Sequence, residues 1–125
     1  MKIKTIIKKS NEKYQITEID NGLESLQDAV GGYIEAPFFP ILEKHGITMF
    51  INEEGKLLDL PPSIAVIING ELFDFICGNA VFTSSDDDGN TTSLNNEQIE
   101  IIEKLLNNSK KCMTSDGILL DVIEM

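Results

Sequence analysis

The chain has 125 residues and a net charge of −11, because 21 acidic residues outnumber 10 basic residues that are all lysines. This balance argues against a protein that grips nucleic acid, since such proteins present a basic face to the phosphates. Hydrophobic residues form 42% of the sequence, enough for a core, and no apolar run is long enough to cross a membrane. We therefore expect one cytoplasmic domain over residues 1–125, with no direct nucleic-acid binding and no membrane contact.

A β-hairpin and a short helix are the first elements expected along the chain. Residues 2–7 and 14–18 are β-prone and flank a polar turn at 10–12. Both faces of this hairpin are mixed in character, which predicts a place at the edge of a sheet with modest burial. Apolar side chains at helical spacing over 23–30 then predict a helix that Gly31-Gly32 ends.

The middle of the chain has the pattern of strands joined by polar turns. Residues 47–51 and 56–60 are expected to form the two arms of a hairpin around the turn 52–55. Residues 63–68 are apolar and fit either a buried strand or a short helix. The pair Asn69-Gly70 that follows is a strong signal for a two-residue hairpin turn, although a helix ending at Gly70 is also consistent with it.

The last third of the chain predicts one more long strand, a helix and a final strand. The β-type run 72–82 contains Gly78-Asn79, which predicts a bulge or a close backbone approach. After a polar loop, Asn95 and Gln98 have the spacing of a capping box and open an amphipathic helix. Residues 118–123 alternate as a strand does. The elements together predict a small α+β domain, mostly antiparallel sheet with two short amphipathic helices.

Few side chains in this sequence suit catalysis or metal binding. His45 is the single histidine and lies in a predicted turn, and Cys77 and Cys112 are too few for a metal framework or a disulfide scaffold. Acidic residues that begin at Asp86 follow the spacing of a calcium loop, but Thr91 stands where that loop needs glycine. We therefore predict a protein that is not an enzyme and holds no metal and no cofactor.

Polar residues beside the predicted turns suit a nucleotide-like ligand better than they suit catalysis. Tyr33 or Phe82 could stack on a base, and Asn52 and Asn79 stand in turns whose backbone N–H groups could bind phosphate. Lys56 adds a positive charge next to one of these turns. Plain turn chemistry is the alternative explanation for the same asparagines.

Five short motifs follow one another between about residues 28 and 105: Val30-Gly31-Gly32-Tyr33-Ile34-Glu35, Phe50-Ile51-Asn52-Glu53-Glu54-Gly55-Lys56-Leu57, Leu60-Pro61-Pro62, Ile76-Cys77-Gly78-Asn79-Ala80, and Ser93-Leu94 before an Asn-Asn-Glu-Gln helix start. Their order and spacing resemble a family of small proteins from phages, plasmids and firmicute mobile elements that is catalogued as a domain of unknown function. The resemblance implies an α+β accessory protein of a mobile element, and many such proteins counter host immunity.

Two non-catalytic hypotheses follow from this resemblance. In the first, the chain sequesters a nucleotide-derived immune signal, similar to the Thoeris anti-defence sponges, through Tyr33, Asn52, Lys56, Asn79 and Phe82. In the second, it is an acidic, anti-CRISPR-like protein that binds a nuclease effector and blocks its nucleic-acid site, through Asp86, Asp87, Asp88, Glu97 and Glu100. The apolar pair Phe38-Phe39 predicts either core packing or a homo-oligomer interface.

Overall fold

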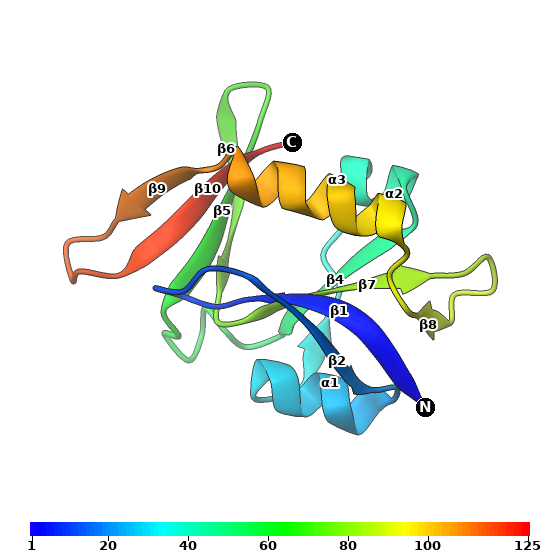
Figure 1. Ribbon diagram of the computed structural model, residues 1–125. Coiled ribbons are helices and arrows are strands. Elements are labelled where there is room, and N and C mark those ends of the chain that lie inside the picture. Colours follow the sequence, from blue (N-terminus) through cyan, green and yellow to red (C-terminus); the bar gives the residue numbers. More distant parts are fainter.

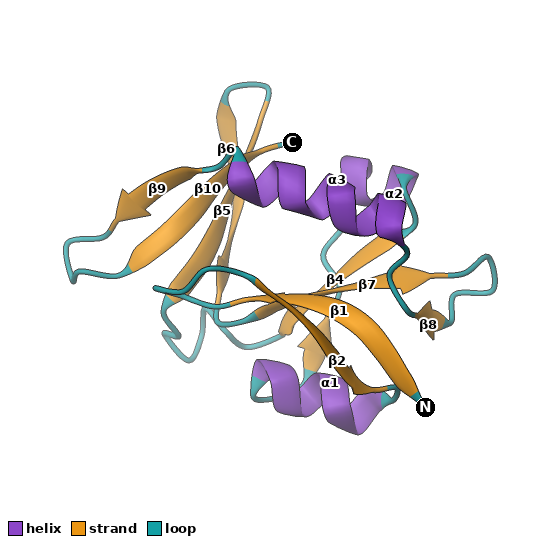
Figure 2. Ribbon diagram, in the orientation of Figure 1, coloured by secondary structure: helices purple, strands orange, loops and turns teal.

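Two β-sheets and three helices make up the computed structural model, which describes residues 1–125 (Figures 1 and 2). The strands are β1 (Lys2–Lys8), β2 (Gln15–Asp20), β3 (Ile34–Glu35), β4 (Ile47–Asn52), β5 (Pro62–Ile68), β6 (Glu71–Cys77), β7 (Ala80–Ser85), β8 (Thr91–Thr92), β9 (Lys110–Met113) and β10 (Leu119–Glu124). The helices are α1 (Leu23–Val30), α2 (Pro40–Lys44) and α3 (Asn96–Asn107). The predicted α+β class, with mostly antiparallel sheet, is confirmed, and α2 is an additional short helix.

The first sheet has the strand order β2-β1-β7-β4-β3, and β8 pairs with the end of β7. All of its pairs are antiparallel. The predicted hairpin of β1 and β2 is present, but β1 is not at an edge because Ile6 pairs with Phe82 of β7. The expectation of modest burial was therefore wrong for β1, whose Ile3 and Ile6 belong to the buried core.

The second sheet has the order β6-β5-β10-β9, with one parallel pair between β10 and β5. Residues 63–68, for which the sequence allowed either a buried strand or a short helix, are part of strand β5. Asn69 and Gly70 both have positive φ, 54° and 80°, and form the tight turn into β6. The predicted return strand at 56–60 is instead a series of turns. Gly78-Asn79 is not a bulge within one strand, since it carries the chain from β6 in this sheet to β7 in the first sheet.

A core of 16 buried residues draws on both sheets and on α2 and α3. The alternation of β7 explains how helices come to cover both faces of the first sheet. Phe82 belongs to the large core together with Ile102 of α3, whereas its neighbour Val81 packs with Leu26 of α1 in a smaller cluster. Accordingly, α3 and α1 lie on opposite sides of β1 and β7 in Figure 1.

The predicted capping box fixes where α3 begins. The Asn95 side chain accepts a hydrogen bond from the Gln98 amide at 2.8 Å, and the Gln98 side chain accepts one from the Asn95 amide at 3.0 Å. The Gln98 side chain also donates to the carbonyl of His45 at 3.0 Å and to the Ser84 hydroxyl at 2.9 Å. Gln98 therefore also anchors the start of α3 to the first sheet and to the end of α2.

Candidate functional site

The two asparagines predicted to bind a ligand use their side chains within the fold. Asn52 donates to the carbonyl of Val30 at 3.2 Å and accepts from the amide of Glu54 at 2.8 Å. Asn79 donates to the carbonyl of Ala29 at 2.9 Å. Because the last carbonyls of a helix lack partners within the helix, these two side chains complete the end of α1. Plain structural chemistry, the alternative that the sequence left open, accounts for both.

The structure does not bring the other three predicted ligand contacts into one pocket. Phe82 is 1% exposed, so its ring packs in the core and has no free face for a base, which corrects the stacking role predicted for it. Tyr33, which follows the two glycines that end α1, is 66% exposed and lines none of the larger cavities that hold Asn52, Asn79 or Lys56. The Nζ atom of Lys56 lies 2.6 Å from Oδ1 of Asp74 and 4.5 Å from the centroid of the Phe75 ring, so its charge is already paired within the fold. No cavity therefore holds all five predicted contacts, although Asn52 and Asn79 line one cavity of about 440 Å³ and Asn52 and Lys56 line another of about 70 Å³.

The acidic set is exposed throughout, at Asp86, Asp87, Asp88, Glu97 and Glu100. Within it, Asp86 has a structural role, because its carboxylate accepts from the amides of Asp88 at 3.0 Å and Asn90 at 2.8 Å. The hydrogen bonds from Asn90 hold the pKa of Asp86 below its usual value. No group of three or more His, Cys, Asp or Glu side chains is arranged to hold a metal ion.

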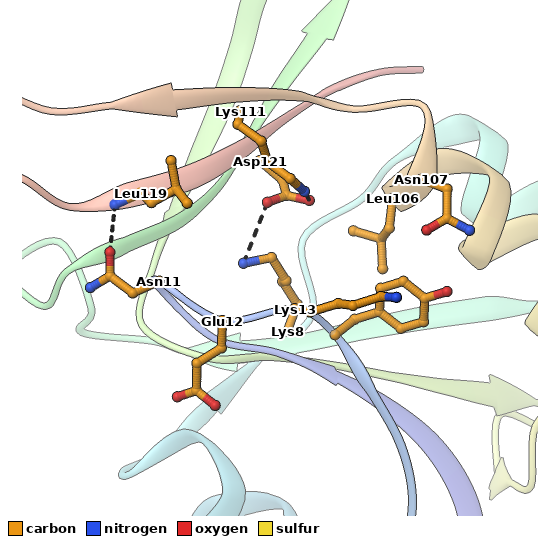
Figure 3. Close-up of a pocket in the computed structure, with 10 residues that line it drawn as sticks. Lys8, Asn11, Glu12, Lys13, Leu106, Asn107, Lys111, Leu119 and Asp121 are labelled. Carbon is orange, nitrogen blue, oxygen red and sulfur yellow. Dashed lines mark hydrogen bonds and ion pairs between the residues drawn. The ribbon is translucent and has the colours of Figure 1, made fainter.

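A different site emerges where the turn between β1 and β2 docks onto β10 of the other sheet. Asn11, at the tip of that turn, accepts through its side-chain Oδ1 from the Leu119 N–H at 2.6 Å (Figure 3). The backbone N–H of Asn11 donates to the carbonyl of Leu119 at 2.9 Å. Beside this contact lies a cavity of about 390 Å³ between the sheets, which we call the inter-sheet pocket. It is lined by Lys8, Asn11, Glu12, Lys13, Tyr14, Leu106, Asn107, Lys111, Leu119 and Asp121.

A buried ion pair between the two sheets forms the floor of the inter-sheet pocket. Lys8 ends β1 with its side chain 1% exposed, and its Nζ lies 3.6 Å from Oδ1 of Asp121 on β10 (Figure 3). The other carboxylate oxygen of Asp121 accepts from Lys111 Nζ at 2.6 Å and from the Ser109 hydroxyl at 2.8 Å. Asp121 thus has three partners, Lys8, Lys111 and Ser109. Lys8, by contrast, is paired with one carboxylate, that of Asp121.

The Lys8 ammonium has hydrogen-bonding capacity that the protein does not use. It carries three N–H donors. One of them binds the carbonyl of Lys9, and the 3.6 Å separation from Asp121 is an ion-pair distance rather than a hydrogen bond. Burial lowers the pKa of Lys8 below 10.5, against the opposing attraction of Asp121. Donors of this kind at a pocket floor would bind an oxygen anion well, because such a bond is charge-assisted.

The rim of the inter-sheet pocket adds two more lysines and an aromatic ring. Lys8, Lys13 and Lys111 with the carboxylates of Glu12 and Asp121 give this pocket a charge of +1, in a chain whose net charge is −11. The pocket is therefore a local positive site on an acidic protein. Its Asn11 and Asn107 amides and the Tyr14 ring are groups that can recognise the polar edge and the face of a planar base.

Sequence reasoning missed this site because its two halves are far apart along the chain. The alternation of β1 places Lys8 on the same face as the buried Ile6, and this is the signal that could have revealed a buried lysine. In the same way, Asp121 alternates with the buried Ile123 of β10. Neither pattern identifies the other residue as its partner.

A second cavity, of about 630 Å³, lies between α2, α3 and the second sheet. Five aliphatic side chains line it, and its charged residues, Lys104, Lys110 and Glu124, are all exposed. His45, predicted to occupy a turn, is also part of this wall, at the end of α2. Since no buried charged group points to a ligand here, the inter-sheet pocket is the better candidate.

A family model described as a domain of unknown function (DUF3846) matches residues 1–107. The chain belongs to the DUF3846 family. The DUF3846 match runs from β1 to the end of α3, so it includes Lys8, Lys13 and Tyr14 of the pocket but not β9 and β10, which carry Lys111 and Asp121. No curated protein and no solved structure matches the chain. None of its helices is both long and apolar enough to span a membrane.

Tyr14 provides a spectroscopic test of the pocket geometry. Burial, and then the hydrogen bond from its hydroxyl to Glu103 Oε2 at 2.8 Å, raise the pKa of Tyr14 above 10.0. In a Tyr33→Phe variant, which leaves Tyr14 as the single tyrosine, tyrosinate absorbance should therefore rise with a midpoint above 10.0. Because folding raises this pKa, the associated stability is complete below about pH 10 and falls as the pH climbs through the folded value.

The matched control for this titration is Glu103→Gln in the same background. It removes the acceptor charge that favours the protonated phenol, so the midpoint should move back down. A midpoint at or below 10.0 in the Tyr33→Phe protein would contradict this geometry.

Proposed function

We propose that this DUF3846 protein acts without catalysis and sequesters a nucleotide-derived signal of a host antiviral defence in the inter-sheet pocket. The observation that carries the proposal is the buried Lys8 ammonium, which has unused donors at the floor of a pocket with local positive charge. A phosphate needs such donors, and Lys13 and Lys111 could share its remaining charge. The origin in a mobile element rests on the sequence resemblance.

The shape and composition of the pocket support a small ligand rather than a macromolecule. Its volume of about 390 Å³ lies in the range of cavities that hold small molecules. The Tyr14 ring takes the stacking role that the sequence had given to Phe82 and Tyr33. His45, Cys77 and Cys112 do not line this pocket, so the side chains best suited to nucleophilic or acid–base catalysis are elsewhere. The residues that line the inter-sheet pocket therefore suit binding of a ligand without chemical change.

The test begins with protein purified from cells that carry an active nucleotide-signalling defence. Native mass spectrometry, followed by heat release and mass spectrometry of the small molecules, should find a stoichiometric nucleotide. Titration calorimetry of the empty protein with ADP-ribose and with nucleoside diphosphates then measures affinity directly. A protein that is empty after purification and binds none of these probes would overturn the proposal.

Lys13→Gln and Lys44→Gln form a matched pair for the calorimetry. Both lysines are exposed, but Lys13 lines the pocket and Lys44 lies at the end of α2, outside it. Loss of a charge-assisted contact to phosphate should weaken binding about tenfold in Lys13→Gln. Lys44→Gln should bind as the wild type does, and equal losses in both variants would point to a non-specific charge effect.

The alternative proposal is an acidic inhibitor of a nuclease effector, and the full exposure of its five predicted carboxylates favours it. The combined variant Asp87→Asn/Asp88→Asn/Glu97→Gln/Glu100→Gln should then lose inhibition of a Cas-type nuclease. Asp86 is left unchanged because it holds its own turn together. Inhibition at the wild-type level by this variant would exclude the acidic surface as the active feature.

A further inference from the structure

The carboxylate at the floor of the inter-sheet pocket, like the lysine beside it, keeps hydrogen-bonding capacity that the fold does not use. The two hydrogen bonds that Asp121 accepts, from Lys111 and Ser109, both end on its Oδ2 atom. Its Oδ1 atom has the ion-pair contact with Lys8 at 3.6 Å and accepts no hydrogen bond. Since a carboxylate oxygen has lone pairs for such bonds, the floor presents a free acceptor beside the free donors of Lys8.

Both of these side chains are shielded from water outside the pocket. The side chains of Lys8 and Asp121 are 1% and 5% exposed, and both line the pocket (Figure 3). A buried donor or acceptor without a partner costs free energy, so a ligand that satisfies both gains more than one that meets either alone. Because the two atoms are 3.6 Å apart, two oxygens of one small group can reach both of them.

The charges around the floor limit the charge that such a group can carry. Lys8 and Lys111 contribute +2 and Asp121 contributes −1, so the floor has a charge of +1. A ligand group with one negative charge neutralises this set. A second negative charge would lie next to the Asp121 carboxylate and be repelled by it. The floor therefore suits a monoanion that also carries a proton for Oδ1 of Asp121.

We propose that the floor of the inter-sheet pocket binds a terminal phosphate group in its singly protonated form. An unprotonated phosphate oxygen accepts from Nζ of Lys8, and the P–OH group donates to Oδ1 of Asp121. The proton stays on the phosphate, because a phosphate monoester loses it at about pH 6 and an aspartic acid at about pH 4. This inference rests on the proposed function and narrows it, since it names the kind of phosphate that the pocket selects.

The class of ligand follows from which phosphates have such a proton. A nucleotide with a terminal phosphate has one near neutral pH, whereas a phosphate that bridges two groups has none. ADP and ADP-ribose form a matched pair of probes, because ADP-ribose is ADP with its terminal phosphate esterified. Titration calorimetry at about pH 6.5 should give a dissociation constant at least about tenfold lower for ADP. Equal or tighter binding of ADP-ribose would overturn this inference and leave the proposed sequestration standing, whereas absence of binding by either probe counts against the proposed function itself.

Inorganic phosphate and sulfate test the floor without a base or a sugar. The two ions have the same tetrahedral shape, but sulfate has no proton to donate near neutral pH. Phosphate should therefore bind with a dissociation constant at least about tenfold lower than that of sulfate. A site that held the anion through its lysines alone would bind the two ions equally well, and that result would overturn the inference.

Phosphorus NMR reads the protonation state of bound AMP from its chemical shift as the pH is varied. A site that only stabilises negative charge lowers the pKa of a bound phosphate, whereas a hydrogen bond from its proton to Asp121 raises it. The midpoint for bound AMP should lie at least about one pH unit above the free value of about 6. A midpoint at or below that of free AMP would overturn the inference.

The pH series also needs a measure of the charges that the protein itself gains or loses. The titratable groups that face the phosphate are Lys8 of β1, Lys111 of β9, Asp121 of β10, and Glu12, Lys13 and Tyr14 between β1 and β2. From α3 the pocket receives Leu106 and Asn107, which do not titrate. Sulfate affinity over the same pH range reports any loss of lysine charge, because sulfate itself does not titrate there.

Asp121→Asn should abolish the preference for phosphate over sulfate. Lys111 and Ser109 both donate to Oδ2, so the new amide oxygen should take that place and the amide N–H groups should face the anion. The matched control is Asp116→Asn, an exposed acid outside the pocket, which should keep the wild-type preference. A folded Asp121→Asn protein that keeps this preference would overturn the role of Asp121. Circular dichroism checks the fold, and if the variant is unfolded, the wild-type phosphate, sulfate and AMP measurements decide the inference on their own.

Discussion

Asp121→Leu is expected to cost about 3–5 kcal/mol of unfolding free energy, because it leaves the Lys8 ammonium buried without a counter-charge. The Lys8 side chain is 1% exposed at the floor of the inter-sheet pocket and Asp121 is its paired carboxylate, so water can replace little of the lost counter-charge. Urea denaturation followed by circular dichroism measures the loss. A cost below about 1 kcal/mol, the scale of an exposed pair, would contradict a buried charge here.

Lys8→Met is the matched control and should cost far less than Asp121→Leu. Asp121 keeps Lys111 and the Ser109 hydroxyl when Lys8 is replaced, so no buried charge is left without partners. The double variant Lys8→Met/Asp121→Leu should recover most of the stability, since replacing both members of a buried pair by apolar residues is often neutral or stabilising. Additive losses in the double variant would show that the two side chains do not interact.

The pH dependence of Asp121→Leu follows from the lowered pKa of Lys8. Without Asp121 the pKa of Lys8 should fall further, because desolvation is then unopposed. In the window between this folded value and the unfolded value of about 10.4, the unfolded chain binds more protons than the folded one. Stability therefore rises with pH across that window, and part of the loss in Asp121→Leu should be recovered as the solution becomes alkaline.

The class of fold was readable from the sequence because it depends on local signals. Asn69-Gly70 marks a hairpin turn by its own chemistry, and Asn95 with Gln98 marks a helix start by its spacing. The place of each strand in its sheet depends instead on partners far along the chain. The N-terminal hairpin was expected at an edge with modest burial, and β2 is indeed the edge strand, but β1 lies inside the sheet because β7, distant in sequence, pairs with it.

The candidate site was less readable than the fold, because a pocket is assembled by tertiary contacts. Asn52 and Asn79 stood out as polar residues near glycines, a pattern that also describes side chains that complete the end of a helix. Phe82 stood out as an aromatic residue, but strand alternation turns it into the core. The buried pair of Lys8 and Asp121 looks like ordinary surface charge until the two sheets are placed together.

Gly55 shows the same limit for a single backbone position. The sequence assigned this glycine to the end of a tight turn, and the turn is present, with the Gly55 amide bound to the carbonyl of Asn52 at 3.1 Å. The stronger requirement is steric, because a Cβ at this buried position would overlap the carbonyl oxygen of Cys77 and stand 3.2 Å from its carbon. Cys77 ends β6, so the turn lies directly against the second sheet.

Gly55→Ala is therefore expected to destabilise the fold by about 3 kcal/mol, because backbone atoms at both sides of the contact must move apart. That is a large fraction of the 5–15 kcal/mol typical of a domain, and it should appear as a lower urea midpoint with an unchanged slope. The matched control is Gly70→Ala, where φ is +80° and no atom lies within 4 Å of the added Cβ. Its cost is limited to the left-handed backbone, about 1–2 kcal/mol. Since Gly55 lies outside the left-handed region, an alanine tolerated there better than at position 70 would mean that the 52–55 turn does not press against β6.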